Sequence, residues 1–219
     1  MPAVGEHHPA FEEYCECIYE LAEDDVSVIQ ARIADRLQVS RPAVSEMIRR
    51  METEGLLTTD GSIRLTAAGQ VIALRTVRRH RIAERFLTDL LGLPWADAHH
   101  EAGRWEHVMS TAVEEAMDRV LGHPTTCPHG NPIPGAGYDA PAQVTLSQVT
   151  IGQTFTVSRI PEALEFTPGL LEFLESNSIL PGRSGSVTAA SPDGTVTIEI
   201  EDRHVGVGAY ASNRILVVV

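Results

Sequence analysis

Residues 40–66 read SRPAVSEMIRRMETEGLLTTDGSIRLT, and this stretch decides the fold of the first part of the chain. Ser40 is a good helix N-cap and Pro42 suits a first turn, so a helix is expected from residue 41. Its apolar face repeats at i, i+3, i+4 and i+7, as Val44, Met47, Ile48 and Met51. After Gly55, residues 56–59 and 63–66 flank a polar turn, which predicts a small hairpin.

The residues before this stretch complete a pattern known from DNA-binding proteins. Residues 28–37 have helical spacing and are separated from residue 41 by a short turn, Gln38-Val39-Ser40. Upstream, residues 11–22 form an amphipathic helix with an acidic edge. The order helix, helix-turn-helix and hairpin wing is typical of a winged helix-turn-helix, which indicates binding to double-stranded DNA.

The distribution of charge supports this interpretation although the formal net charge is −13. All 17 basic residues are arginine, and residues 28–50 hold five of them against two carboxylates. A locally basic face can bind phosphate even when the whole chain is acidic. The candidate DNA-binding residues are Arg32, Ser40, Arg41, Pro42, Ser45, Glu46, Arg49 and Arg50, with Arg32, Arg49 and Arg50 as the phosphate contacts.

Composition and length bound the remaining possibilities. A chain of 219 residues that is 43% hydrophobic can bury a substantial core. No apolar run approaches the roughly 18 residues that span a bilayer, and the first residues lack a basic segment followed by an apolar one. Cys15, Cys17 and Cys127 are an odd set, so we expect reduced thiols or metal ligands. We therefore expect a cytoplasmic protein with no membrane partner.

The rest of the chain divides into a helical part and a β part. Long helices are expected at residues 67–91 and 96–121, with the segment Gly92-Leu93-Pro94 between them. Residues 122–142 are rich in proline and glycine and are interpreted as a linker. From residue 143, short alternating runs at 154–160, 185–189, 195–200 and 214–219 predict a small β-barrel, with one helix near 169–175.

Two groups of histidine and carboxylate side chains are candidate metal sites. His80 and Glu84 are i, i+4 on one helix, and His99 lies early on the next helix, which could turn back to face them. Glu106 and His107 lie on that second helix, and Glu13 and Glu16 could join them if the first helix packs nearby. Imidazole and carboxylate together suit first-row divalent ions. An isolated pair of this kind is also common on helix surfaces, so spacing alone does not establish a site.

Four stretches of the sequence carry a resemblance to a known family. They are residues 31–37 (ARIADRL), 79–87 (RHRIAERFL), 104–110 (RWEHVMS) and 130–135 (GNPIPG). Together they resemble the diphtheria-toxin-repressor family of iron- and manganese-dependent regulators, most strongly over residues 11–137. The tail matches the family's SH3-like domain only in its pattern.

The resemblance implies a mainly α fold with a small β part, in three domains. These are a winged helix-turn-helix at 1–74, a helical metal-binding and dimerisation domain at 75–140, and an SH3-like β-barrel at 141–219. It implies a homodimeric transcriptional repressor of metal-homeostasis genes that binds operator DNA and has no enzymatic activity. Fe2+ or Mn2+ would be the cofactor, and Co2+, Ni2+ or Zn2+ would substitute in vitro.

The resemblance also implies which residues hold metal. An ancillary site would use His80, Glu84 and His99, and Glu165 and Glu172 flank the segment where the SH3-like domain would add ligands, unless both are solvated surface charges. A primary site would use Glu106, His107, the side chain at 13 and both the side chain and carbonyl of residue 103.

The primary site departs from both branches of the family. The iron-sensing branch has Met and Cys where this chain has Glu13 and Gly103. The manganese-sensing branch is similar to this chain in its acidic residues at the positions of Glu13 and Glu16, but it has Glu where this chain has Gly103. Loss of both sulfur donors favours harder ions such as Mn2+ and Fe2+. Cys17 could place a thiolate in the space beside Gly103, or it could be a plain buried thiol.

Two other functions and one detail of DNA reading stay open at this point. A metalloenzyme could use the same histidines and carboxylates, but no nucleophile motif or phosphate-binding glycine loop accompanies them. A winged-helix regulator with degenerate metal sites is the other alternative, which Gly103 keeps open. Arg41 and Glu46 replace Gly and Gln of iron-sensing relatives. They could read G·C pairs, or Arg41 could grip phosphate while Glu46 pairs with Arg49 or Arg50.

Overall fold

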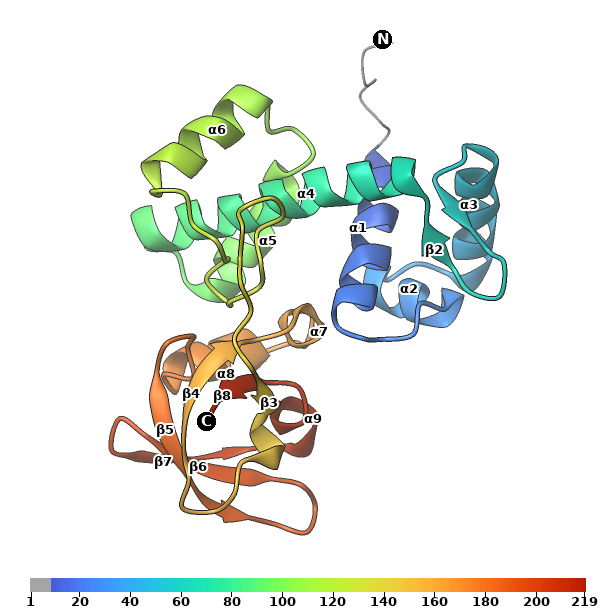
Figure 1. Cartoon of the computed structure of the whole chain (residues 1–219). Helices are drawn as coiled ribbons and strands as arrows, with labels where there is room; N and C mark the ends of the chain where they lie inside the picture. The colour runs from blue at the N-terminus through green and yellow to red at the C-terminus, as the bar shows by residue number, and fades with distance from the viewer. Residues whose placement is uncertain (1–8) are drawn as a thin grey trace.

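The structure is a computed structural model that describes residues 9–219. The first eight residues, on which our expectation about a leader segment rests, lie outside this range. No helix within residues 9–219 combines the length and the hydropathy needed to cross a bilayer. The predicted architecture, mainly helical with a small β part, is confirmed, and Figure 1 shows a helical region joined to a separate β domain.

The first part of the chain folds as the sequence predicts. Helices α1 (Pro9–Glu23), α2 (Gln30–Leu37) and α3 (Arg41–Thr53) precede the two-residue strands β1 (Leu57–Thr58) and β2 (Arg64–Leu65), which pair antiparallel as the wing. Helix α3 begins where expected because the side chain of Ser40 accepts a hydrogen bond from the Ala43 amide. The apolar faces of α1, α2 and α3 share one buried core with the start of the next helix.

Helix α4 (Ala67–Arg85) links the DNA-binding part to the rest of the helical region. It begins at the N-cap Thr66 directly after the wing and runs across the middle of the molecule, with α1 packed along its first half (Figure 1). The domain limit that we place between residues 74 and 75 falls inside this helix, and the limits of the three domains stay a prediction.

The second long helix predicted from the sequence, residues 96–121, is wrong as a single element. Helix α4 continues into a π-helical turn, η1 (Phe86–Leu90), and is followed by α5 (Trp95–Trp105) and then by a separate α6 (Thr111–Val120). The break occurs because the side chain of Ser110 caps a new helix by accepting from the Val113 amide. Glu106 and His107 therefore lie at the C-terminal end of α5 instead of in the middle of a helix.

The C-terminal part is a six-stranded antiparallel sheet in the order β3-β8-β4-β5-β6-β7. The strands are β3 (Val144–Thr145), β4 (Thr154–Arg159), β5 (Ser184–Ala190), β6 (Val196–Ile200), β7 (Arg203–Val207) and β8 (Leu216–Val218). The short helices are η2 (Leu146–Gln148), α7 (Glu162–Glu165), α8 (Leu170–Ser176) and α9 (Ala209–Ser212). Sequence analysis missed β7, α7 and α9, since each is a run of only four or five residues.

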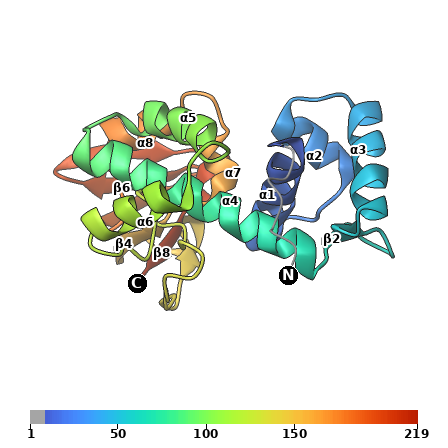
Figure 2. The same ribbon diagram turned by 90° about the horizontal axis from the view of Figure 1, so that it is seen from above.

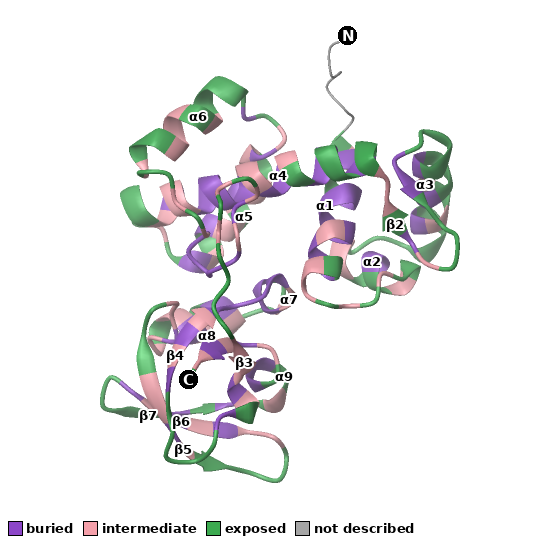
Figure 3. Cartoon of the chain, viewed as in Figure 1, coloured by how far each residue is buried: buried purple, intermediate pink, exposed green. Residues whose placement is uncertain are grey.

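The β domain and the helical region meet through α5, α7 and α8. Trp95, the first residue of α5, is buried in the core of the β domain, and its amide donates to Glu175 of α8. Figure 2, seen from above, shows α5 over α8, and Figure 3 shows buried stretches in α4 and α7. This junction places α7 beside the candidate metal residues of α4 and α5.

The close approach of the wing to α4 generates a prediction about Gly69. A Cβ at this position would overlap the backbone carbonyl of Leu56, which has no flexible end to move away. We expect Gly69→Ala to destabilise the protein by about 1–3 kcal/mol, as overpacking does, measured as a lowered thermal midpoint.

Gly206→Ala is the matched control, because a Cβ there makes only an ordinary van der Waals contact with Thr195. An alanine in a strand is usually better than a glycine by roughly 0.5–1 kcal/mol. Equal midpoints for the two variants would contradict the proposed clash at Gly69.

Candidate metal centre and nucleic-acid interface

The histidine and carboxylate side chains on α4 and α5 come together as the sequence predicts. His80 Nε2 lies 3.2 Å from Glu84 Oε1 and 3.2 Å from His99 Nδ1. His99 Nδ1 lies 2.9 Å from Glu84 Oε1. Packing of α5 against α4 produces this arrangement, because it turns His99 back onto the face that carries the i, i+4 pair.

Two further segments add donors to this group. Glu165 of α7 places Oε2 3.2 Å from His99 Nδ1 and 2.8 Å from Nδ1 of His129. Cys127 and Glu162 lie close enough for their donor atoms to join the same region. The residues His80, Glu84, His99, Cys127, His129, Glu162 and Glu165 are called the inner cluster below.

Sequence analysis missed two members of the inner cluster, His129 and Glu162, and it left Cys127 open as either a reduced thiol or a metal ligand. Residues 122–142 were interpreted as a linker, yet Cys127, His129 and Asn131 are buried, and the Ile160 amide donates to the His129 carbonyl. The spacing Cys127-Pro128-His129 was the available signal. Glu162 lies three residues before Glu165, so one short helix presents both carboxylates.

Two of the sequence-based candidates for this region lie elsewhere or differ from expectation. Glu172 is exposed on α8 and belongs to none of the potential metal-holding groups within residues 9–219. It fits the alternative that we gave, a solvated charge. Glu165 is buried against His99 and His129, so the solvated-charge interpretation of Glu165 is wrong.

The inner cluster has the geometry and the electrostatics of a cation site. Nitrogen and oxygen ligands at about 2.0–2.2 Å from a cation lie roughly 3–3.5 Å from one another, which matches the separations above. Glu84 Oε2 and Glu162 Oε2 are buried without a hydrogen-bond partner, and such atoms are rare in folded proteins. The imidazole nitrogens and carboxylate oxygens of the inner cluster are ligands that suit a first-row divalent metal ion.

A second group of donors, called the outer cluster, lies between α1 and the end of α5. It consists of Glu13, Glu16, His80, Glu106 and His107. His107 Nε2 lies 3.1 Å from Glu106 Oε1 and 3.9 Å from Glu13 Oε1. Glu16 is buried, and its Oε1 atom has no hydrogen-bond partner. Burial and the neighbouring carboxylates of Glu106 and Glu20 raise the pKa of Glu16 well above its ordinary value.

His80 belongs to both clusters, which the sequence did not reveal. Its Nε2 atom faces the inner cluster, while its Nδ1 atom lies 2.5 Å from Glu106 Oε2 in the outer cluster. An imidazole that uses one nitrogen as a ligand can donate from the other nitrogen to a carboxylate. The two clusters are therefore connected through a single side chain.

Glu12 is a second residue that sequence analysis missed. It is 5% exposed, whereas the side chain of the neighbouring Glu13 is 54% exposed. Glu12 Oε2 lies 2.9 Å from His107 Nδ1, and Arg75 donates to Glu12 Oε1 at 2.6 Å. This carboxylate orients His107 so that Nε2 faces the outer cluster. Adjacent glutamates on a helix give no signal about which one is buried.

Gly103 and Cys17 lie on the wall of a cavity beside the outer cluster, and neither adds a side-chain donor to a potential metal-holding group within residues 9–219, while the Gly103 carbonyl stays a predicted ligand. A Cβ at Gly103 would meet no atom within 4 Å, so the position faces open space. Cys17 is buried on the wall of the same cavity, and burial raises the pKa of its thiol to about 12. All three cysteines are unpaired thiols, and within residues 9–219 Cys17 belongs to no potential metal-holding group.

The candidate DNA-binding residues lie on the exposed side of the helix-turn-helix. Arg41, Pro42 and Glu46 are exposed on α3. Arg49 donates to Ser45, Arg50 stacks over the Phe11 ring, and Arg32 donates to the Ser27 carbonyl. Among the described residues, neither Arg49 nor Arg50 forms an ion pair with Glu46, so the Glu46 carboxylate is free to contact another molecule.

The electrostatics of the inner cluster predict proton release when metal binds. Burial lowers the pKa of His99, but hydrogen bonds with Glu165 and Glu84 outweigh burial and raise it from 6.5 to about 9. At neutral pH a cation must displace this proton, so affinity should rise with pH up to about 9. Calorimetric titrations in buffers of different ionisation enthalpy measure the number of protons released when metal binds. The His99→Ala variant should release fewer protons than the unaltered chain.

The same pKa shift sets the sign of a stability effect in the metal-free protein. A raised folded-state pKa means that His99 stabilises the fold fully below about pH 6.5 and that this contribution is lost as the pH rises through about 9.

In the calorimetric titrations, a binding enthalpy that does not depend on the buffer would contradict the assignment of a protonated His99.

Comparison with known families covers most of the chain. Residues 8–62 match the iron dependent repressor N-terminal DNA binding domain, and residues 66–135 match the iron dependent repressor metal binding and dimerisation domain. Residues 144–219 match the FeoA domain. The three matches follow the winged-helix, helical and β parts of the structure.

Individual relatives give the same result. The chain is 42% identical to the iron-dependent repressor IdeR of Mycobacterium leprae over 202 residues, which cover 86% of this chain and 87% of the relative. It is 48% identical to the diphtheria toxin repressor of Corynebacterium diphtheriae over 126 residues, covering 57% and 56%.

Solved structures of similar proteins share the whole fold. A manganese-dependent transcriptional repressor in complex with manganese superposes with a TM-score of 0.84 at 33% identity, covering 95% of this chain and 99% of that one. T. acidophilum IdeR superposes with a TM-score of 0.77 at 28% identity over the full length of both chains. These proteins are repressors and not enzymes. The chain therefore belongs to the diphtheria-toxin-repressor family of metal-dependent transcriptional repressors.

Proposed function

We propose that this chain represses metal-homeostasis genes when Fe2+ or Mn2+ is bound, with Co2+, Ni2+ or Zn2+ able to substitute. The observation that carries the proposal is the pair of connected donor clusters, which join α1, α4, α5 and α7 through His80. Relatives named iron-dependent repressors and a neighbour bound to manganese support these ions. A repressor acts on DNA, so we also propose that the protein works in the cytoplasm.

The residues of the outer cluster couple ion binding to the position of the DNA-binding part. Glu13 and Glu16 lie on α1, whose apolar side chains share a core with α2 and α3. Glu13 and Glu16 would hold a cation together with Glu106 and His107, which follow the end of α5, and the ion would supply the positive charge that joins α1 to α5. Without that charge, Glu16 and Glu106 could not both stay ionised so close together, which is one cause of the raised pKa of Glu16, and α1 would be held less firmly. The orientation of α3 then follows the orientation of α1.

Operator DNA would contact the exposed face of α3. The side chains at Ser40, Arg41, Pro42, Ser45, Glu46 and Arg49 lie on or near that face, and Arg32 and Arg50 flank it. Arg32, Arg49 and Arg50 would contact phosphates, and the start of a recognition helix usually contacts base edges. Arg41 and Glu46, near the start of α3, would then contact base edges.

A second copy of the chain would cover an apolar surface on α5 and α6. Val108 is 82% exposed, and Val113 and Met117 line the same hollow with Trp105 and Met109. Exposed apolar side chains gathered in one place mark interaction sites. The helical part matches a metal-binding and dimerisation domain, which supports a homodimer that spaces two α3 helices on DNA.

The donor set favours a working sensor over a degenerate one. The outer cluster presents three carboxylates and two imidazoles with no sulfur, a set suited to Mn2+ and Fe2+. The inner cluster adds the Cys127 thiol, whose pKa burial raises to about 11, so a metal ion would have to displace its proton. The buried unpartnered oxygens of Glu16 and Glu84 are hard to explain in a site that no ion uses.

Removal of outer-cluster donors tests the function directly. We expect Glu106→Ala and His107→Ala to remain folded and to lose metal-dependent DNA binding, because each removes a donor that joins α5 to α1. Fluorescence anisotropy of labelled DNA, selected in vitro for binding to the protein, reports affinity across Mn2+, Fe2+, Co2+, Ni2+ and Zn2+.

Glu172→Ala is the control, since Glu172 is an exposed glutamate outside both clusters. It should retain the metal response of the unaltered chain. If Glu106→Ala and His107→Ala keep the same metal-dependent affinity as this control, the outer cluster does not activate DNA binding and the proposal fails.

The free carboxylate of Glu46 generates a prediction about the operator. Glu can accept a hydrogen bond from cytosine N4, whereas Gln favours adenine, so Glu46→Gln should shift the selected sequences from G·C toward A·T at one position. Changing the contacted base pair should cost about 1–3 kcal/mol of binding free energy in the unaltered protein. Parallel selection from random DNA with the two proteins measures the shift.

Glu54→Gln makes the same chemical change just after the end of α3 and serves as the control. It should leave the selected sequences as they are. Identical base preferences for all three proteins would show that Glu46 does not read DNA.

A further inference from the structure

A cavity of about 320 Å³ lies between α1, α2 and α5, beside the outer cluster. Its wall includes Glu13, Glu16, Glu106 and His107, and the Oε1 atom of Glu16 is buried there without a hydrogen-bond partner. An octahedral site for an ion such as Mn2+ takes about six donor atoms, whereas the outer cluster has five side chains. The cavity therefore has room for a further ligand.

The wall of this cavity lacks a side chain at Gly103. A Cβ built there would meet nothing within 4 Å, so the helix surface is open at this point. Side chains on a helix lean toward its N-terminus, so a residue at 103 would cover the turn before it. The space that Gly103 leaves lies next to the turn that carries His100.

His100 is an imidazole on the same face of α5 and on the same cavity wall. It precedes Gly103 by three residues, a spacing that keeps both on one side of α5, and it lines the same cavity as His107, which follows the end of the helix. Its side chain is exposed, and within residues 9–219 it makes no hydrogen bond or ion pair and belongs to none of the potential metal-holding groups, so the ring would have to turn toward the cluster to bind an ion. Neighbours at i, i+3 have Cβ atoms roughly 5–6 Å apart, which is within reach of an imidazole ring.

We propose that His100 is a metal ligand of the outer cluster, occupying the space that Gly103 leaves open. The inference rests on the proposed role of this cluster in binding a divalent ion, and it adds a ligand that the family resemblance did not supply. An added imidazole increases the share of nitrogen donors, which moves the preference of the site from Mn2+ toward Fe2+, Co2+ and Ni2+. His100 would thus help to set which metal activates this repressor.

The test uses the full chain, with Co2+ as the probe and His204→Ala as the matched control. His204 is another exposed histidine, placed on β7 away from both clusters. Calorimetric titration measures Co2+ affinity, and Glu106→Ala identifies the binding phase that belongs to the outer cluster. Proton NMR of the Co2+-loaded protein counts the hyperfine-shifted imidazole N–H signals of bound histidines.

We expect His100→Ala to weaken the outer-cluster phase by about 10-fold or more, the lower end of the loss seen for outer-shell partners. It should also remove one shifted imidazole signal, and His204→Ala should do neither. Gly103→Glu places a carboxylate at the open position. In the Gly103→Glu variant, the additional change His100→Ala should therefore weaken Co2+ binding much less. This pattern would separate a ligand from a residue that only supports the helix.

Two results would overturn the inference in distinguishable ways. If His100→Ala matches His204→Ala while Glu106→Ala loses the phase, the outer cluster binds metal and His100 takes no part. If Glu106→Ala also leaves the titration unchanged, the outer cluster itself is not the site, and both the proposed function and the role of His100 fail.

Discussion

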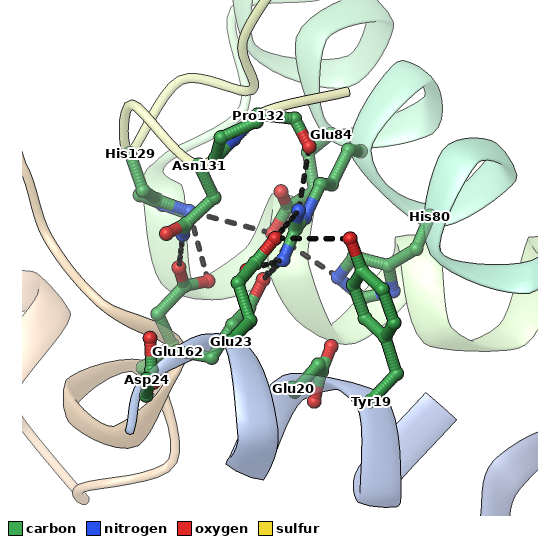
Figure 4. A network of polar contacts seen from close by, with 12 residues as sticks. Tyr19, Glu20, Glu23, Asp24, His80, Glu84, His129, Asn131, Pro132 and Glu162 are labelled. Carbon is green, nitrogen blue, oxygen red and sulfur yellow. Dashed lines mark hydrogen bonds and ion pairs between the residues drawn. The ribbon is translucent and has the colours of Figure 1, made fainter. Parts of the chain in front are cut away.

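The buried guanidinium of Arg81 is the point at which the three parts of the chain meet. Arg81 is 0% exposed, and its nitrogen atoms donate to both carboxylate oxygens of Glu23 on α1, to Glu162 on α7 and to the Pro132 carbonyl. Figure 4 shows Glu23, Glu162 and Pro132 converging from these separate segments. A charge this deeply buried is tolerated only with all partners present, and loss of one partner typically costs about 3–5 kcal/mol. The requirement fixes α1, residues 127–133 and α7 relative to α4.

The position of the inner cluster is a consequence of this ion network. Glu162 and Glu165 lie on one short helix, so the contact of Glu162 with Arg81 also brings Glu165 to His99 and His129. Arg159 strengthens the same junction by pairing with Glu23 and Asp24 at the end of α1. Phe166 connects this junction to α2. Arg36 of α2 stacks on the Phe166 ring, and the Phe166 and His99 rings pack in a T-shaped arrangement. Changes at the inner cluster can therefore be transmitted to the helix-turn-helix through direct contacts.

The acidic composition of the chain also has a structural explanation. Glu12, Glu16, Glu20, Glu84, Glu106, Glu162 and Glu165 are all buried, which carboxylates rarely are. They face histidines, arginines or the two clusters instead of solvent. A DNA-binding protein can therefore carry a net charge of −13, because seven of its 30 acidic residues are buried beside internal histidines and arginines while α3 keeps its exposed arginines.

The sequence by itself determined the local elements and the pairs that lie on one element. The spacing of Val44, Ile48 and Met51, with Ser40 as N-cap, specified α3, and His80 and Glu84 were recognisable as neighbours because four residues make about one helical turn. Only the tertiary structure decided which distant groups meet. It brought His129 and Glu165 to His99, chose Glu12 over Glu13 as the partner of His107, and gave His80 to both clusters. These contacts depend on packing between segments up to about a hundred residues apart, which no periodicity encodes, since a helical repeat defines only which side chains share a face.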